Sequence, residues 1–203
     1  MPNLFESRRS VGDFDSARPL DSERLREIVR LAAFAPSAMN LQPWRLIAVR
    51  SPEARQRLYD VARHQPRILQ APVTLIVVGE AFGWDETNPV WDELALLQGG
   101  DRTRVERSIS SATLNYGATS ETRARFAAKN AALFSMGLLL AAKSLGVDSH
   151  PMDGMDLEGV SREFGLSERE HPILLIALGY HDDAKTIPPR RRRRTYDELV
   201  EEV

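Results

Sequence analysis

The residues of this 203-residue chain whose types and spacing could do chemistry begin in segment 6–14. This segment carries Arg8, Arg9 and Ser10, which place two guanidinium groups beside a hydroxyl. Guanidinium groups bind phosphate oxygens through charge-assisted hydrogen bonds, so the segment could hold a phosphate or a polyhydroxyl chain. Arginine pairs near a terminus more often only solvate a surface, and this pair therefore needs support from elsewhere in the sequence.

A second segment, 35–45 with the sequence APSAMNLQPWR, follows about one predicted helix later. Pro36 ends that helix, and Asn40 tolerates the backbone geometry of a turn. The segment is rich in small residues, so its backbone amides could closely approach a flat ring. The two segments together, rather than either alone, indicate a binding site.

Two later segments could add to such a site. Residues 148–155, DSHPMDGM, indicate either a plain strand and turn or a backbone ledge that could face a bound ring. The run Arg190–Arg194 indicates either a solvated or nucleic-acid-binding tail or a phosphate-binding element. Because the net charge is -2, phosphate binding within the protein is favoured.

The composition excludes several kinds of protein. With 42% apolar and 28% charged residues, the chain is typical of a soluble globular protein, and its charge gives no reason to expect nucleic acid or a membrane as a partner. The absence of cysteine excludes disulfides, thiolate metal sites and cysteine nucleophiles. The N-terminus has no apolar signal core, and the longest apolar run, 134–142, is well short of the roughly 20 residues that span a bilayer. We therefore expect a cytoplasmic protein.

Motifs of other enzyme classes are absent from the sequence. It contains no G-x-G-x-x-G, no P-loop and no G-x-S-x-G. Its four histidines are scattered without metal-ligand spacing, so no metal site is expected. The tryptophans indicate core packing, with Trp84 or Trp91 as an alternative lining of a substrate pocket.

Hydrophobic periodicity predicts the elements that must position these residues. Helices are predicted over 21–34, 53–64, 122–145 and 157–164, and strands over 44–49, 73–78 and 173–178. The helix over 122–145 has more apolar surface than one face needs, which favours a central position or a subunit interface. Residues 82–116, with a short helical piece over 90–98, are expected to form an excursion that covers a site or a partner subunit. Without a repeat or a linker, the chain is expected to be a single domain, 1–203.

Taken in order from Glu6 to Val203, these segments resemble the FMN-dependent nitroreductase family. The resemblance implies an α+β fold, a three-layer sandwich in which helices flank a mostly antiparallel sheet. It also implies an intertwined homodimer, with FMN bound at the interface and contacted by both subunits.

The resemblance assigns a role to each segment. Phosphate and ribityl contacts fall on Arg8, Arg9 and Ser10, and a phosphate clamp in the tail falls on Arg191 and Arg193. Contacts from the other subunit to the ring fall on Pro36, Ser37, Ala38 and Asn40. The basic residue near the pyrimidine end of the flavin ring corresponds to Arg67, whose charge would stabilise the reduced flavin. The ledge near N5 falls on Pro151, Met152, Asp153 and Gly154.

Two positions depart from the family pattern. Gly12 stands where arginine or lysine is common, so a cationic contact is missing there unless glycine is needed for a positive φ. His64 stands where the family often has an amide side chain.

The activity that the resemblance implies is hydride transfer from NADH or NADPH to a small-molecule acceptor, a nitroaromatic or a quinone, by a ping-pong mechanism. No side chain is needed as nucleophile or general base, because the flavin carries the chemistry. Other flavin chemistry on the same scaffold, such as reductive dehalogenation or flavin breakdown, stays open. So does a non-enzymatic flavin binder, or a cofactor-free interaction protein that uses the arginine tail.

Overall fold

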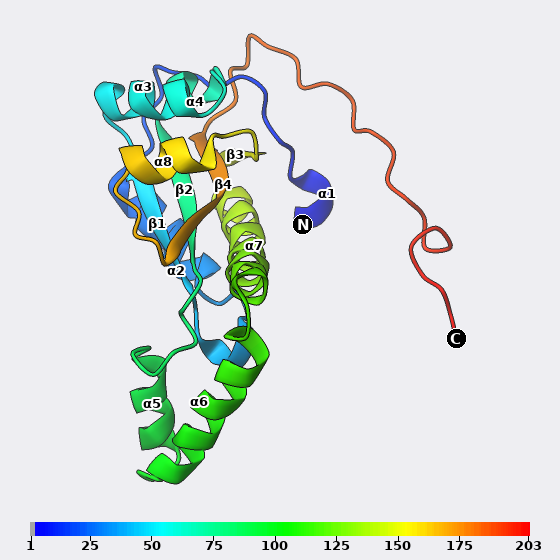
Figure 1. Ribbon diagram of the computed structural model, residues 1–203. Helices are drawn as coiled ribbons and strands as arrows, with labels where there is room; N and C mark the ends of the chain where they lie inside the picture. Colours follow the sequence, from blue (N-terminus) through cyan, green and yellow to red (C-terminus); the bar gives the residue numbers. More distant parts are fainter. Residues whose placement is uncertain (1–2) are drawn as a thin grey trace.

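The computed structural model describes residues 3–203, and its centre is one antiparallel sheet with the strand order β1-β2-β4-β3 (Figure 1). The strands are β1 (Trp44–Val49), β2 (Val73–Glu80), β3 (Asp148–Met152) and β4 (Glu170–Gly179). All three strand pairs are antiparallel. The expectation of an α+β fold with a mostly antiparallel sheet is therefore confirmed.

The central strand β2 explains why the sheet is covered on both faces. Its side chains alternate between two cores, because successive residues of a strand point to opposite faces. Val73, Leu75 and Val77 contribute to one core, and Ile76 and Val78 to the other. A strand buried on both faces reads as a continuous apolar run, which is how this strand was found in the sequence.

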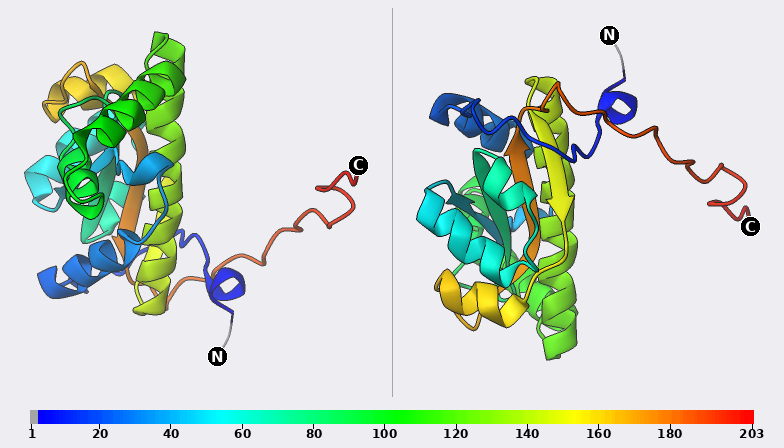
Figure 2. Two further views of the ribbon diagram at one scale, coloured as in Figure 1. Left: turned by 90° about the horizontal axis from the view of Figure 1, so that it is seen from below. Right: turned by 90° about the horizontal axis from the view of Figure 1, so that it is seen from above.

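Helices form a layer on each face of the sheet (Figures 1 and 2). The first layer contains α2 (Ser22–Ala32) and α7 (Ser120–Ser144), and the second contains α3 (Pro52–Val61), α4 (Arg67–Gln70) and α8 (Leu157–Glu163). Asp21 caps α2 as expected, and a capping box between Thr119 and Thr122 begins α7.

Two element boundaries differ from the sequence expectation by three residues, more than any other predicted boundary. Helix α3 ends at Val61 rather than at His64, because Arg63 and His64 take left-handed backbone conformations with φ of 51° and 52°. Strand β4 begins at Glu170 rather than at Ile173, because its first residues pair with the end of β2. Both differences depend on tertiary contacts that periodicity does not encode.

The excursion is a helical hairpin of α5 (Val90–Leu97) and α6 (Arg102–Tyr116), which projects from one end of the sheet (Figure 1). Helix α6 was not expected, since its charged and serine-rich sequence buries only Val105 and Ala112. Trp84 and Trp91 are buried and donate hydrogen bonds to backbone carbonyls, so both serve packing. That the hairpin covers a site or a partner stays a prediction.

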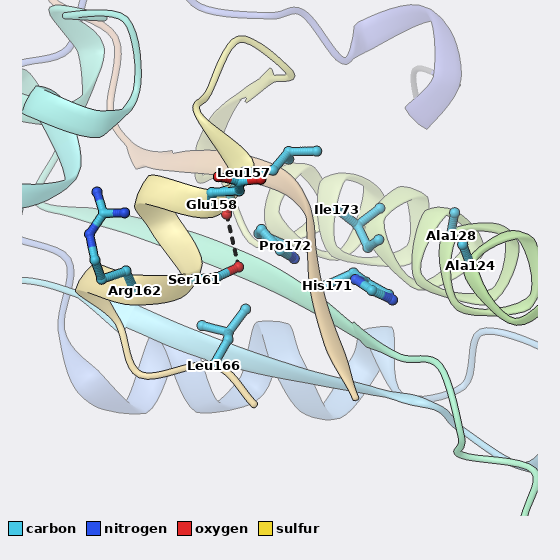
Figure 3. A pocket seen from close by; sticks show the side chains of 10 residues that line it. All are labelled: Ala124, Ala128, Leu157, Glu158, Ser161, Arg162, Leu166, His171, Pro172 and Ile173. Carbon is cyan, nitrogen blue, oxygen red and sulfur yellow. Dashed lines mark hydrogen bonds between the residues drawn. The ribbon is translucent and has the colours of Figure 1, made fainter. Parts of the chain in front are cut away.

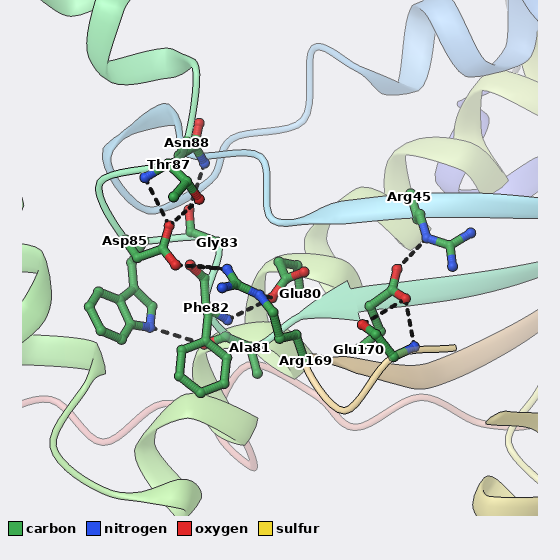
Figure 4. Close-up of polar contacts among 12 residues, drawn as sticks. Arg45, Glu80, Ala81, Phe82, Gly83, Asp85, Thr87, Asn88, Arg169 and Glu170 are labelled. Carbon is green, nitrogen blue, oxygen red and sulfur yellow. Dashed lines mark hydrogen bonds and ion pairs between the residues drawn. The ribbon is translucent and has the colours of Figure 1, made fainter. Parts of the chain in front are cut away.

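Salt bridges connect the segment that precedes the hairpin to the sheet (Figure 4). Arg169, just before β4, contacts Glu80 at 3.3 Å and Asp85 at 2.8 Å. Its neighbour Glu170 pairs with Arg45 of β1. These contacts hold the first residue of the excursion beside the start of β4.

The N-terminal segment and the start of the C-terminal tail lie beside the β3 side of the sheet. The short helix α1 (Leu4–Ser7) leads into residues 10–14, which form bridges between Ser10 and Ser149 and between Phe14 and His181. Beyond Ile187, which still packs against the second core, the tail is extended and runs away from the sheet (Figure 2). Within residues 3–203, no helix has the length and apolar character to cross a membrane.

Candidate functional site

An arginine-lined cavity forms where the N-terminal segment meets the tail. Its volume is about 260 Å³, and it is lined by Arg8, Arg9, Ser10, Pro188, Pro189, Arg190, Arg191 and Arg193. None of these lining residues is acidic. Burial lowers the pKa of Arg8, and the charges of Arg190, Arg193 and Arg9 lower it further. An anion in this cavity would relieve that repulsion, so the residues present fit a phosphate group.

Hydrogen bonds to backbone carbonyls determine which arginines face this cavity. Arg190 donates from Nη2 to the carbonyl oxygens of Glu6 (2.6 Å) and Arg8 (2.8 Å), and Arg9 donates to the Pro188 carbonyl. Arg192 instead pairs with Glu198 at 2.7 Å. Of the run 190–194, the structure places Arg191 and Arg193, the two that the resemblance selects, together with Arg190 in the lining of the cavity.

A second cationic group lies next to Gly12. Arg67 begins α4, and its Nη2 is 3.9 Å from the point where a Cβ on Gly12 would lie. The Nε atom of Arg67 is buried and has no hydrogen-bond partner within residues 3–203. Gly12 is not among the glycines with positive φ in that range, so the alternative that a positive φ requires glycine there is wrong. The absent side chain leaves open space beside the guanidinium group.

His150 lies beside the same segment, and within the predicted segment 148–155 it was not among the residues selected for the site. Its Nδ1 is 2.6 Å from the carbonyl oxygen of Val11, the residue before Gly12. Burial lowers the pKa of His150 and the charge of Arg67 lowers it further, while the hydrogen bond to Val11 opposes both. The imidazole is therefore neutral at pH 7 and donates from Nδ1 to that carbonyl.

The predicted ledge after β3 is held from the turn between α3 and α4. Gln65 donates from Nε2 to the Gly154 carbonyl at 2.8 Å, and the Asp156 N–H donates to the Val61 carbonyl at 2.8 Å. The backbone N–H groups of Asp153, Gly154 and Met155 have no acceptor within residues 3–203. Three successive free donors on a fixed turn are suited to the polar atoms of a bound ring.

Backbone strain concentrates in two segments, one within the predicted segment 35–45 and one shortly before Arg67. Within residues 3–203, every non-glycine residue with positive φ lies in 39–42 or 63–64, namely Met39, Asn40, Gln42, Arg63 and His64. Such conformations cost free energy and persist where the surroundings enforce them, which happens often at binding sites. The strained turn at 63–64 is the one that presents Gln65 and Arg67.

The segment 36–40 lies apart from the other predicted residues. It includes the short helix η1 (Ala38–Asn40), and the Ala38 N–H donates to Oδ1 of the buried Asn130 of α7 at 2.8 Å. Within the part of the chain that the structure describes, no hydrogen bond or salt bridge joins segment 36–40 to the arginine-lined cavity or the ledge. That this segment contacts the flavin ring from the other subunit of a dimer stays a prediction.

Other cavities offer no comparable chemistry. One of about 600 Å³ lies between α7, α8 and the start of β4, and it is lined by Ala124, Ala128, Leu157, Glu158, Ser161, Arg162, Leu166, His171, Pro172 and Ile173 (Figure 3). None of the predicted site residues lines it. Within residues 3–203, no group of three or more acidic or histidine side chains could hold a metal ion.

Known proteins give an independent view of the chain. The sequence profile described as Nitroreductase family matches residues 5–180. YodC of Bacillus subtilis is 33% identical over 178 residues, which is 87% of each chain, and MhqN of the same species is 28% identical over 98% of this chain and 97% of its own. Both names provisionally class these relatives as NAD(P)H nitroreductases. The crystal structure of B. subtilis YdfN, also provisionally a nitroreductase, aligns with a TM-score of 0.91 and 26% identity over 98% of this chain and 97% of that one.

Proposed function

The chain belongs to the nitroreductase family, and from that premise we propose that it is an FMN-dependent oxidoreductase, which transfers hydride from NADH or NADPH to a small-molecule acceptor. The observation that carries the proposal is the arginine-lined cavity, whose guanidinium groups have no acidic neighbour among the lining residues. Nitroaromatics and quinones are the acceptor classes that family membership supports.

The residues of the site fit the two ends of FMN. Arg8, Arg9 and Ser10, together with Arg191 and Arg193, would hold the phosphate. Arg67, whose buried Nε has no partner, would stand at the pyrimidine end of the ring. The free N–H groups of the ledge, from Pro151 through Met152 and Asp153 to Gly154, would face the polar edge near N5.

In this proposal the protein binds FMN, orients its ring and adjusts its redox potential, and no side chain acts as a nucleophile. FMN, when bound, supplies a ring that accepts two electrons from NADH or NADPH and gives them to the acceptor. Arg67 would favour the reduced state, since a fixed positive charge stabilises the negative charge that reduction adds. Donor and acceptor would use the same face of the site in turn, which predicts ping-pong kinetics.

A homodimer is part of this proposal. The long helix α7 buries one side against the sheet and leaves Ala132, Leu133 and Met136 exposed on the other. Phe34, just after α2, is 79% exposed. Apolar side chains gathered on an exposed helix support burial against a second copy. That copy would bring its own segment Pro36–Asn40, with Ser37 and Ala38, toward the ring. We expect light scattering to give a dimer at micromolar concentration, and a monomer that still holds flavin would contradict this.

One spectrum and one set of assays test the proposed function. The purified chain should be yellow, with flavin absorption, and should oxidise NADH or NADPH in the presence of a quinone or a nitroaromatic. A colourless protein that takes up no added FMN would contradict the proposal and favour a cofactor-free interaction protein. Flavin without turnover would favour a flavin-binding protein, and turnover only with halogenated substrates or with flavin itself would favour the other chemistries of the scaffold.

A further inference from the structure

His150 is a titratable side chain between the N-terminal segment and the ledge, and family membership gives it no role. It lies on β3, immediately before Pro151 of the ledge, and is half-buried. Its Nδ1 donates to the Val11 carbonyl at 2.6 Å, which fixes the ring against the N-terminal segment. The remaining ring nitrogen, Nε2, is left as the atom that can take a proton.

The groups around His150 come from three elements. The N-terminal segment contributes the Val11 carbonyl, and β4 contributes Ala177, which pairs opposite His150. Helix α4 contributes Arg67, whose positive charge acts on the imidazole. Arg67 also lies 3.9 Å from the Cβ position of Gly12, so the Arg67 guanidinium and the neutral His150 ring both lie beside the segment that contains this glycine.

This arrangement makes the protonation of His150 depend on the charge of whatever lies beside Arg67. Burial and Arg67 both lower the pKa of His150, so the ring is neutral while no negative charge is near. A new negative charge at the same place would attract both groups and raise that pKa. Two-electron reduction of a flavin at this site places such a charge at its pyrimidine end.

We propose that His150 takes up a proton at Nε2 when FMN bound beside Arg67 takes up two electrons, and thereby compensates for the missing cation at Gly12. The inference rests on the proposed function, because it needs FMN at this site. The hydride from NADH or NADPH carries both electrons and the hydrogen that reaches N5. The second proton, on Nε2 of His150, comes from water, so charge and atoms balance.

The test is the pH dependence of the flavin midpoint potential in the FMN-loaded protein, with His150→Asn as the variant. Asparagine Nδ2 can donate to the Val11 carbonyl in place of Nδ1 but does not titrate. Two protons for two electrons give a slope of about 60 mV per pH unit and one proton gives about 30 mV, since tenfold in the equilibrium constant is about 30 mV for this couple. We expect the parent to approach the steeper slope over part of the range pH 6–8, and the variant to keep the shallower one there.

Two further measurements keep the result unambiguous. His171→Asn, in the separate cavity between α7 and α8, is the matched control and should keep the parental slope. NMR titration of His150 in the parent should show its acid dissociation constant falling about tenfold when FMN is reduced, the size of effect expected of a unit charge about 12 Å away at an effective dielectric of ~20, and more if the charge is nearer. This measurement decides the matter if His150→Asn does not fold.

The outcomes separate this inference from the function on which it rests. Bound FMN with the same slope in parent and His150→Asn, or the same His150 titration in both redox states, overturns the inference and leaves the function standing. A chain that binds no FMN overturns both. A slope that changes in His150→Asn and not in His171→Asn supports the inference.

Discussion

The arginine-lined cavity and the ledge after β3 belong to one candidate site, yet they present their polar groups by different means. The cavity gathers guanidinium groups from the two ends of the chain, and no acidic residue lines it. The ledge instead offers backbone N–H groups, which Gln65 and the strained turn at 63–64 hold in place. One region relies on side-chain charge and the other on backbone geometry.

This difference indicates which region should determine the affinity for FMN and which should determine its redox potential. Charge-assisted hydrogen bonds to a phosphate add binding energy in both redox states of a cofactor and so contribute mainly to affinity. Groups at the ring end meet a charge that changes during reaction, and they contribute mainly to the redox potential. Substitutions in the two regions should therefore change different observables, and each prediction below tests that separation.

The largest expected effect is on FMN affinity, from Arg8→Ala or Arg9→Ala. Each side chain should contribute about 1.5–3 kcal/mol through charge-assisted hydrogen bonds, so affinity should fall about tenfold or more. The melting temperature in the presence of FMN should fall in parallel, because FMN stabilises only the folded state. Fluorescence titration of FMN measures the loss.

Arg192→Ala is the matched control for these variants, since Arg192 pairs with Glu198 rather than lining the cavity. It should bind FMN as the parent does. Equal affinity in Arg8→Ala, Arg9→Ala and Arg192→Ala would remove the cavity from the site.

Arg67→Ala should act on the potential more than on affinity. Without the guanidinium group the reduced state loses its compensating charge, so the midpoint potential should fall by tens of millivolts, where 30 mV is about 1.4 kcal/mol for two electrons. The affinity for oxidised FMN should fall less in Arg67→Ala than in Arg8→Ala. Redox titration with a reference dye measures this, and an unchanged potential with FMN bound would return Arg67 to a purely structural role.

Gln65→Ala tests whether the ledge depends on its support. Loss of the 2.8 Å hydrogen bond to the Gly154 carbonyl should loosen the ledge at a cost of about 1 kcal/mol and slow reduction by NADH or NADPH about fivefold. FMN affinity should change little, because the phosphate end is untouched. Stopped-flow reduction measures the rate. A loss of affinity as large as in Arg8→Ala would erase the distinction between the two regions.

Gly12→Arg would bring side-chain charge into the region that lacks it. Nothing lies closer than 3.9 Å to the Cβ position and φ is not positive, so the side chain should be tolerated. We expect FMN to bind a few-fold more tightly, at about 1 kcal/mol or less, since repulsion from Arg67 offsets part of the gain. Weaker binding or misfolding would show that Gly12 is needed for a reason other than its φ.

The smallest effect is a control outside both regions. The Arg45 hydrogen bond lowers the pKa of Glu170 to about 2, against the partial cost of burial. Because the folded-state pKa lies below the unfolded value of 4.5, the stabilisation is present above about pH 4.5 and is lost as pH falls toward 2. Glu170→Gln should flatten the loss of stability in this window, measured by urea unfolding, and should leave FMN affinity at pH 7 unchanged.

Several features were determined by the sequence alone because their causes are local. The strand 44–49 was predicted with the limits that the structure has, and the cap of α2 at Asp21 was also predicted. Gly146 and Gly165 follow their helices with φ of 70° and 65°, a local conformation that glycine favours at a helix C-terminus. The arginine pair at 8–9 and the arginine run at 190–194 were visible as candidates because residue type alone selects guanidinium groups for phosphate.

Only the tertiary structure decided how the ring end is built. His150 lies 2.6 Å from Val11, Arg67 lies against Gly12, and Gln65 binds Gly154, although each pair is far apart in sequence. Each depends on strands and turns that the sheet brings together, and on two left-handed residues that end α3 early. Periodicity reports which residues are buried but not which distant residue they meet. For that reason the sequence selected the arginines of the phosphate end, while the contacts of His150 and Gln65 emerged only once the fold had placed them beside their partners.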